Sequence, residues 1–224
     1  MKVRFIFYRA KFEFRNFLKT RRIRLVDDAI SFWTWFGNIR TGPYAHVEVW
    51  TPDEGGKFEE RTPLTKVLCD AYGTCWTSTM RGEDNGTVKR PVSEVLTHPE
   101  RWDYIEVDLE EYDYNRLIYW MELEVENNKG YDMKANFSFL TPWRFHDIDK
   151  NNCSEFGHNA AIVAMIKGII WTALQKQKAK LPHDFYVWPM PSKIAELSRH
   201  FKVPSPRRLA RMFTKAGYKM KRLK

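Results

Sequence analysis

Strand-like patterns dominate the first half of the chain. Apolar and polar residues alternate in residues 2–14, which is the period of a β-strand with one buried face. The same alternation, or a short apolar run bounded by turn residues, predicts further strands in residues 27–36, 45–56, 66–73, 74–82, 87–92 and 103–110. Gly73 separates two of these runs and predicts a hairpin there.

Helix-like patterns follow in the second half. Residues 111–130 predict a helix of about four turns, and a long apolar helix begins near Cys153. Shorter helices are predicted in residues 93–102, 192–201 and 205–218, and residues 131–150 are irregular. Strands followed by helices predict an α+β fold, in which an antiparallel sheet packs against the long buried helix. We expect a main domain, residues 1–200, and a basic helical extension, residues 201–224.

The composition is that of a globular protein, since 43% of the 224 residues are hydrophobic and 15% are aromatic. Three cysteines without paired C-x-x-C motifs argue against a disulfide framework and against a zinc site. We therefore expect neither a metal nor a cofactor. The apolar runs are too short or too interrupted for a signal peptide or a transmembrane segment.

The net charge of +9 is concentrated at the two ends of the chain. Residues 206–224 hold eight Lys or Arg and no acid, and residues 2–24 hold nine with a single Glu. Such ends are typical of contact with a polyanion or of a solvated surface. The last helix also carries an apolar stripe, which fits either a docking helix or a helix that packs on the domain. The residues of this stripe are Leu209, Met212, Phe213 and Ala216.

Cys153 stands where a helix is predicted to begin. Asn152 is a good N-cap and Glu155 completes a capping box, which makes Cys153 the first helical residue. The amide groups of a helix N-terminus stabilise a thiolate, so we expect a lowered pKa and a nucleophilic thiol. The alternative is a small buried cysteine that only packs, as we expect for Cys69 and Cys75.

Among the six histidines, His46 is the best candidate for a base. The strand period places His46 and Glu48 on one face and Val47 and Val49 on the other. His158 follows Cys153 on the same helix and is rotated away from it. The remaining histidines stand in turns, loops or helix ends: His98, His146, His183 and His200. A cysteine at a helix N-terminus that faces a histidine on a strand is the papain-type arrangement.

Here the histidine precedes the cysteine by more than a hundred residues. This order, with GPYAHVEVW (residues 42–50) and NNCSEF (residues 151–156), resembles the circularly permuted branch of the NlpC-type papain-like amidases and peptidases. The lecithin–retinol acyltransferase-like proteins are more distantly similar. Weaker similarity in residues 26–34, 74–90, 129–132 and 188–197 extends the resemblance over about residues 20–198.

The resemblance implies a permuted papain-like fold and a role for each residue of the motifs. Cys153 is the nucleophile, and His46 is the general base that later protonates the leaving group. Glu48 is the expected orienting residue, and Thr77 or Ser78 on a neighbouring strand is the alternative. The Tyr44 hydroxyl is a candidate to help the backbone N–H of Cys153 hold the oxyanion, although simple aromatic packing also explains this tyrosine.

Three functions are compatible with this sequence. The first is a cysteine hydrolase that cleaves an amide, in a cell-wall peptide or an amino-acid conjugate, through an acyl-cysteine intermediate. The second is an acyltransferase with the same pair of residues. The third is a non-catalytic module that uses its basic ends on nucleic acid or an anionic surface. Compact hydrolases of the similar family also occur in phages, so we expect a phage protein that is cytoplasmic or virion-associated.

Overall fold

The computed structural model describes residues 1–9, 44–52, 73–80, 84–128, 130–134, 150–166, 169 and 204–223. Within these ranges the chain forms a six-stranded antiparallel sheet in the order β4-β3-β2-β1-β5-β6. The strands are β1 (Lys2–Arg9), β2 (Tyr44–Thr51), β3 (Thr74–Thr79), β4 (Gly86–Pro91), β5 (Trp102–Asp108) and β6 (Lys221–Arg222). The described helical segments are α3 (Val92–Val95), the 3-10 helix η1 (Pro99–Arg101), α4 (Glu111–Glu126), α6 (Cys153–Val163) and α9 (Pro206–Lys215).

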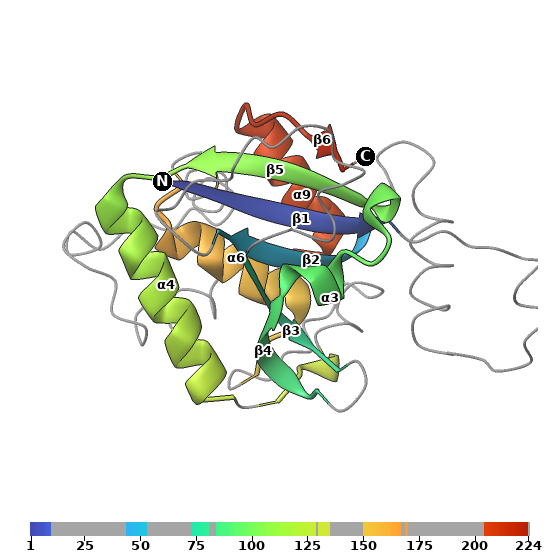
Figure 1. Ribbon diagram of the computed structural model, residues 1–224, viewed down its shortest axis with the longest axis vertical. Helices are drawn as coiled ribbons and strands as arrows, with labels where there is room; N and C mark the ends of the chain where they lie inside the picture. Colours follow the sequence, from blue (N-terminus) through green and yellow to red (C-terminus); the bar gives the residue numbers. More distant parts are fainter. Residues whose placement is uncertain are drawn as a thin grey trace, which may run out of the picture.

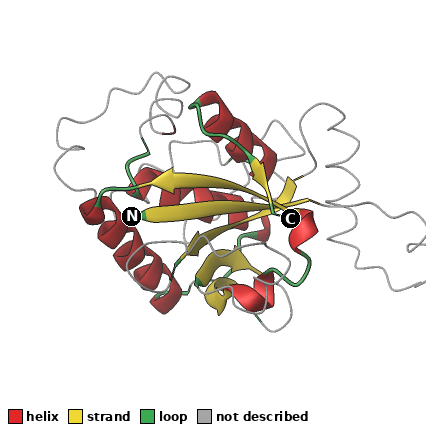
Figure 2. Ribbon diagram, turned by 45° about the horizontal axis from the view of Figure 1, so that its top comes forward, coloured by secondary structure: helices red, strands yellow, loops and turns green. Residues whose placement is uncertain are grey.

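Helices α6 and α9 cross one face of the sheet, behind β1 and β2 in Figure 1. Both helices contact β2, and α4 packs against α6 at the side of the sheet. Strands β3 and β4 are rotated away from the direction of β1 and β5, which shows the strong twist of the sheet (Figure 2). We call the side that carries α6 and α9 the helix face.

The strand register assigns the side chains of β1 and β2 to the two faces. Phe5 lies opposite Val49 and Phe7 opposite Val47, and all four belong to the main core on the helix face. Gly157 lets α6 approach this surface closely, because a Cβ atom there would lie only 3.2 Å from Val47 Cγ1. The backbone of α6 at Gly157 therefore packs directly on the side chain of Val47.

The intervening side chains point to the opposite side, which we call the α3 face. There Ile6 lies opposite Glu48, and Tyr8 lies opposite His46. A second, smaller apolar cluster covers this side, and it includes Val92 of α3. The other buried members of this cluster are Ile6, Trp50, Cys75, Leu96, Trp102 and Leu223.

Helix α9 belongs to the main core. Leu209 and Phe213 are fully buried, and the Phe213 ring lies 4.7 Å from the ring of Phe5. The chain then continues into β6, which pairs with β5. The basic C-terminal helix thus packs on the domain, with Arg211 and Lys215 exposed to solvent.

The predicted α+β class and the antiparallel sheet are confirmed, as is the helix in residues 111–130. The helix predicted in residues 93–102 forms only as the short segments α3 and η1. The first strand of the hairpin predicted at Gly73 lies outside the described residues. The strand predicted in residues 27–36 and the helix predicted in residues 192–201 also lie outside them. Within the described part of the chain, no helix has the length and apolar character needed to cross a membrane.

We expect Phe213→Ala to lower the free energy of unfolding by about 3–5 kcal/mol, because it removes a fully buried ring from the centre of the core. Urea unfolding followed by circular dichroism measures this change. The control is Arg211→Ala on the exposed side of α9, with an expected change of less than about 0.5 kcal/mol. Equal, small effects of both changes would show that α9 is not part of the folded core.

Candidate functional site

Cys153 is the first residue of α6, as the capping pattern predicts. Asn152 is in an extended conformation, and its Oδ1 accepts hydrogen bonds from the backbone N–H of Glu155 and from Ser154 Oγ, both at 2.9 Å. All eleven residues of α6 are buried, and Cys153 itself is 5% exposed within the core on the helix face. The thiol therefore sits at a capped helix N-terminus inside the protein.

The segment before Cys153 is tied to the rest of the fold through Asn151. Its backbone carbonyl accepts hydrogen bonds from Ser78 Oγ on β3 at 2.6 Å and from the backbone N–H of Asp132 at 3.0 Å. Its side-chain amide donates to Glu124 of α4 at 2.6 Å. These bonds fix the start of α6 relative to β3 and α4. Ser78 thus anchors the start of the helix.

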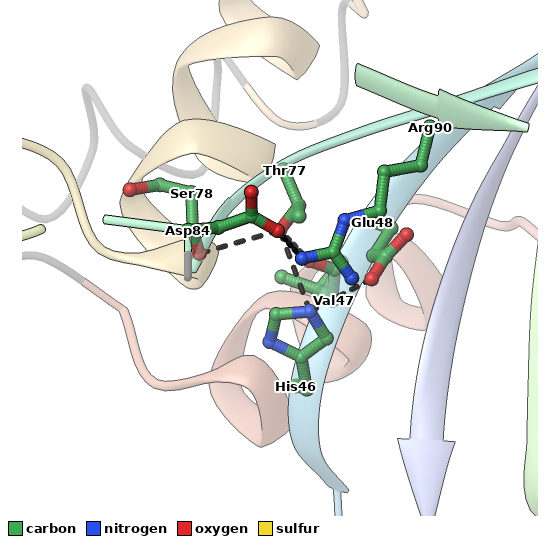
Figure 3. Close-up of polar contacts among 7 residues, drawn as sticks. All are labelled: His46, Val47, Glu48, Thr77, Ser78, Asp84 and Arg90. Carbon is green, nitrogen blue, oxygen red and sulfur yellow. Dashed lines mark hydrogen bonds and ion pairs between the residues drawn. The ribbon is translucent and has the colours of Figure 1, made fainter. Parts of the chain in front are cut away.

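His46, Glu48 and Thr77 form one buried polar group, shown in Figure 3. His46 Nε2 lies 3.0 Å from Glu48 Oε1 and 3.4 Å from Thr77 Oγ1. The Thr77 hydroxyl also donates to the Val47 carbonyl at 3.0 Å. The histidine, its expected orienting carboxylate and one of the two alternative hydroxyls are thus brought together, although none of them is more than 6% exposed.

Two further residues lie beside this group that the sequence did not single out for it. Cys75 is opposite Trp50 in the register, so its thiol shares the face of Glu48. Burial raises the pKa of the Cys75 thiol well above its ordinary value, and the charge of Glu48 and a hydrogen bond to it act in the same direction. Arg90, opposite Cys75 on β4, forms an ion pair with Asp84 next to the group (Figure 3). No pattern in the sequence indicates the register of β2, β3 and β4, which brings Cys75 and Arg90 close to Glu48.

The predicted nucleophile and base lie on opposite faces of the sheet. The His46 ring is on the α3 face, 6.4 Å from the ring of Trp102, whereas Cys153 belongs to the core on the helix face. The cause is the alternation of β2: Val47 packs against α6, so its neighbour His46 points away from that helix. The expectation that the imidazole faces the thiol is not met by this arrangement.

Tyr44 lies on the helix face with Cys153, but its hydroxyl is engaged elsewhere. It donates to Asp103 Oδ2 at 2.6 Å, and Arg9 and Arg222 lie 3.7 and 3.5 Å from the same carboxylate. Burial, together with the hydrogen bond to Asp103 and its negative charge, raises the pKa of Tyr44 above its ordinary value. The Tyr44 hydroxyl is therefore held in an ion-pair cluster and is not directed at an oxyanion beside Cys153.

A cleft of about 280 Å³ opens beside Tyr44, between it and α9. Among the described residues it is lined by Tyr44, Ala210, Arg211, Thr214 and Met220, and neither Cys153 nor His46 is part of the lining. In the described part of the chain no group of three or more His, Cys, Asp or Glu side chains is arranged to hold a metal ion.

Compared with known proteins, the chain matches no family model, no curated protein and no solved structure. The resemblance to the permuted papain-like enzymes therefore depends on the sequence motifs around His46 and Cys153 alone.

His158, five residues beyond Cys153 on α6, makes the stability of the protein depend on pH. Burial lowers its pKa to about 4, and the positive charge of Arg208 adds to this shift. Since the unfolded chain binds the proton near pH 6.5 and the folded chain only near pH 4, the free energy of unfolding falls as pH drops from 6.5 to 4. We expect this residue to contribute a loss of about 2–4 kcal/mol over that window.

The measurement is urea unfolding at several pH values between 4 and 7, for the wild type and for His158→Gln. Glutamine does not titrate, so the variant should lose stability less steeply in this window. Parallel curves for the two proteins would show that His158 binds protons equally in both states.

Proposed function

We propose that the protein is a cysteine hydrolase that cleaves amide bonds through an acyl intermediate on Cys153. The observation that carries this proposal is the position of Cys153 as the first residue of a capped and anchored helix. Backbone N–H groups and the positive end of the helix dipole favour a thiolate there. The motifs around His46 and Cys153, similar to those of permuted papain-like enzymes, support the same conclusion and a papain-like fold.

Cys75 serves as an internal comparison. It is also a buried thiol, but it lies within β3 beside the Glu48 carboxylate, and its pKa is raised. A thiol in that setting stays protonated at neutral pH and is a poor nucleophile. Of these two cysteines, Cys153 is therefore the one suited to attack a carbonyl.

The proposed reaction has two steps. His46 takes the proton of the Cys153 thiol, and the resulting thiolate attacks the amide carbonyl carbon. The tetrahedral intermediate then breaks its C–N bond while the imidazolium of His46 gives this proton to the departing amine. Water next attacks the thioester, His46 takes a proton from this water, and the carboxylic acid leaves as the thiol is restored. If an amine or alcohol replaces this water, the same intermediate yields acyl transfer, so product identity decides between the two reactions.

The role of His46 requires a rearrangement at the start of β2. The β1–β2 register shifts between Tyr8, which pairs with His46, and Arg9, which pairs with Tyr44, so Ala45 is an extra residue in a β-bulge. Bulges re-aim side chains at functional sites. We propose that movement of this bulge past His46 turns the imidazole to the helix face, where Tyr44 and Cys153 lie. In the present arrangement, Glu48 and Thr77 hold the base away from the thiol.

We expect iodoacetamide at neutral pH to label Cys153 at least ten times faster than Cys75, measured by peptide mass spectrometry over time. Cys153→Ala should abolish cleavage of cell-wall peptides and of amino-acid p-nitroanilides, whereas Cys75→Ala should retain it. Labelling of Cys153 no faster than Cys75, with cleavage unaffected by Cys153→Ala, would remove the basis for a cysteine hydrolase.

We expect His46→Gln to lower kcat/KM by about 10²–10⁴-fold, because it removes the general base. The control is His98→Gln, since His98 is an exposed histidine near η1 and should be dispensable. Stopped assays with the same p-nitroanilides measure both variants after their melting temperatures have been compared. If the two variants are equally active, the base is a residue other than His46.

A further inference from the structure

The side-chain amide nitrogen of Asn152 is buried without a hydrogen-bond partner. Asn152 is 0% exposed, and among the described residues its Nδ2 is one of few buried polar atoms that bond to nothing. A buried donor without an acceptor costs about 1–3 kcal/mol, so such a group calls for an explanation. This one directly precedes the proposed nucleophile.

The helix cap fixes which end of the amide is left over. Asn152 Oδ1 accepts from the backbone N–H of Glu155 and from Ser154 Oγ, so the oxygen must face the helix and the nitrogen must face away from these donors. Capping alone does not require asparagine at this position, because serine and aspartate cap helices equally well and carry no amide nitrogen. The unpaired N–H groups are thus a feature that capping does not use.

We propose that Asn152 Nδ2 donates a hydrogen bond to the carbonyl oxygen of the substrate and to the oxyanion that forms when Cys153 attacks. This inference rests on the proposed function. When the sulfur–carbon bond forms, the π electrons of the carbonyl move to its oxygen, and the oxyanion then needs donors in a site that excludes water. The backbone N–H of Cys153 and Asn152 Nδ2 are donors on adjacent residues at the same helix end.

This assignment replaces the role expected for Tyr44. The Tyr44 hydroxyl already donates to Asp103, whereas Asn152 Nδ2 has no competing acceptor in the described part of the chain. The substrate class that fits is a carbonyl compound with a strong hydrogen-bond acceptor, such as an amide, a thioester or an ester. The amide donor would discriminate against electrophiles that form no oxyanion.

Two thiol reactions separate this role from a structural one. Acylation of Cys153 by p-nitrophenyl acetate passes through an oxyanion, and release of p-nitrophenolate reports its rate. Alkylation by iodoacetamide displaces iodide at a CH₂ carbon and forms no oxyanion, so it reports only the reactivity and accessibility of the thiol. The test variant is Asn152→Ser, which keeps an N-cap hydroxyl but removes the amide donor.

A matched control is available on the same helix. Asn159 is a second buried asparagine with an unpaired side-chain atom, 4% exposed, and it lies about 9 Å along the helix from Cys153. Asn159→Ser makes the same change of side chain at a distance from the thiol. Cys153→Ala provides the rate of acylation that does not involve this cysteine.

We expect Asn152→Ser to slow Cys153-dependent acylation by about 10²–10³-fold and alkylation by less than about threefold, while Asn159→Ser slows neither reaction appreciably. An equal loss of rate in both reactions would show that Asn152 only holds the thiol in place. No loss of rate in acylation would show that Asn152 does not bind the oxyanion. Either result overturns the inference and leaves the hydrolase proposal standing. Absence of Cys153-dependent acylation in the wild type, with the thiol unreactive toward iodoacetamide as well, overturns both.

Discussion

Helix α6 packs on β2 through a close contact between Gly157 and Val47, and the arrangement of both faces of the sheet follows from this contact. Gly157 brings the helix so close to the strand that Val47 and Leu209 of α9 fill the space a Cβ atom would need. One contact therefore sets the position of two helices on the sheet. It places Val47 and Val49 under the helices, so that His46 and Glu48, which alternate with them, point to the opposite face.

Because apolar clusters cover both faces of the sheet, polar groups are buried on both faces. On the α3 face, Glu48 is shared between the imidazole of His46 and the thiol of Cys75. On the helix face, the cap of α6 leaves the amide nitrogen of Asn152 without a partner next to Cys153. Unpaired buried groups are costly, and a role in ligand binding or catalysis is one explanation for such a group. The proposed chemistry uses one of them, the amide nitrogen of Asn152.

The local elements were largely predictable because their signals are local. The alternation in residues 2–9 and 44–51, and the cap formed by Asn152, depend on neighbours within a few positions, and the structure has a strand or a helix start at each. The approach of Thr77 to His46 was foreseen only as one of two options, because the register between β2 and β3 is not encoded in either strand alone. The approach of Cys75 to Glu48 depends on the same register and is not encoded in either strand alone.

Local patterns in the sequence specify the α+β class, the apolar face of β2 and the position of Cys153 at a helix N-terminus. They also hold the reason why His46 turns from the thiol: an apolar helix packs on Val47 and Val49, so the polar side chains between them point away. The folded chain adds two facts: α9 completes the core, and the side chain of Asn152, unlike that of Tyr44, keeps an unpaired hydrogen-bond donor. Both depend on contacts between residues distant in the chain, which no local pattern specifies.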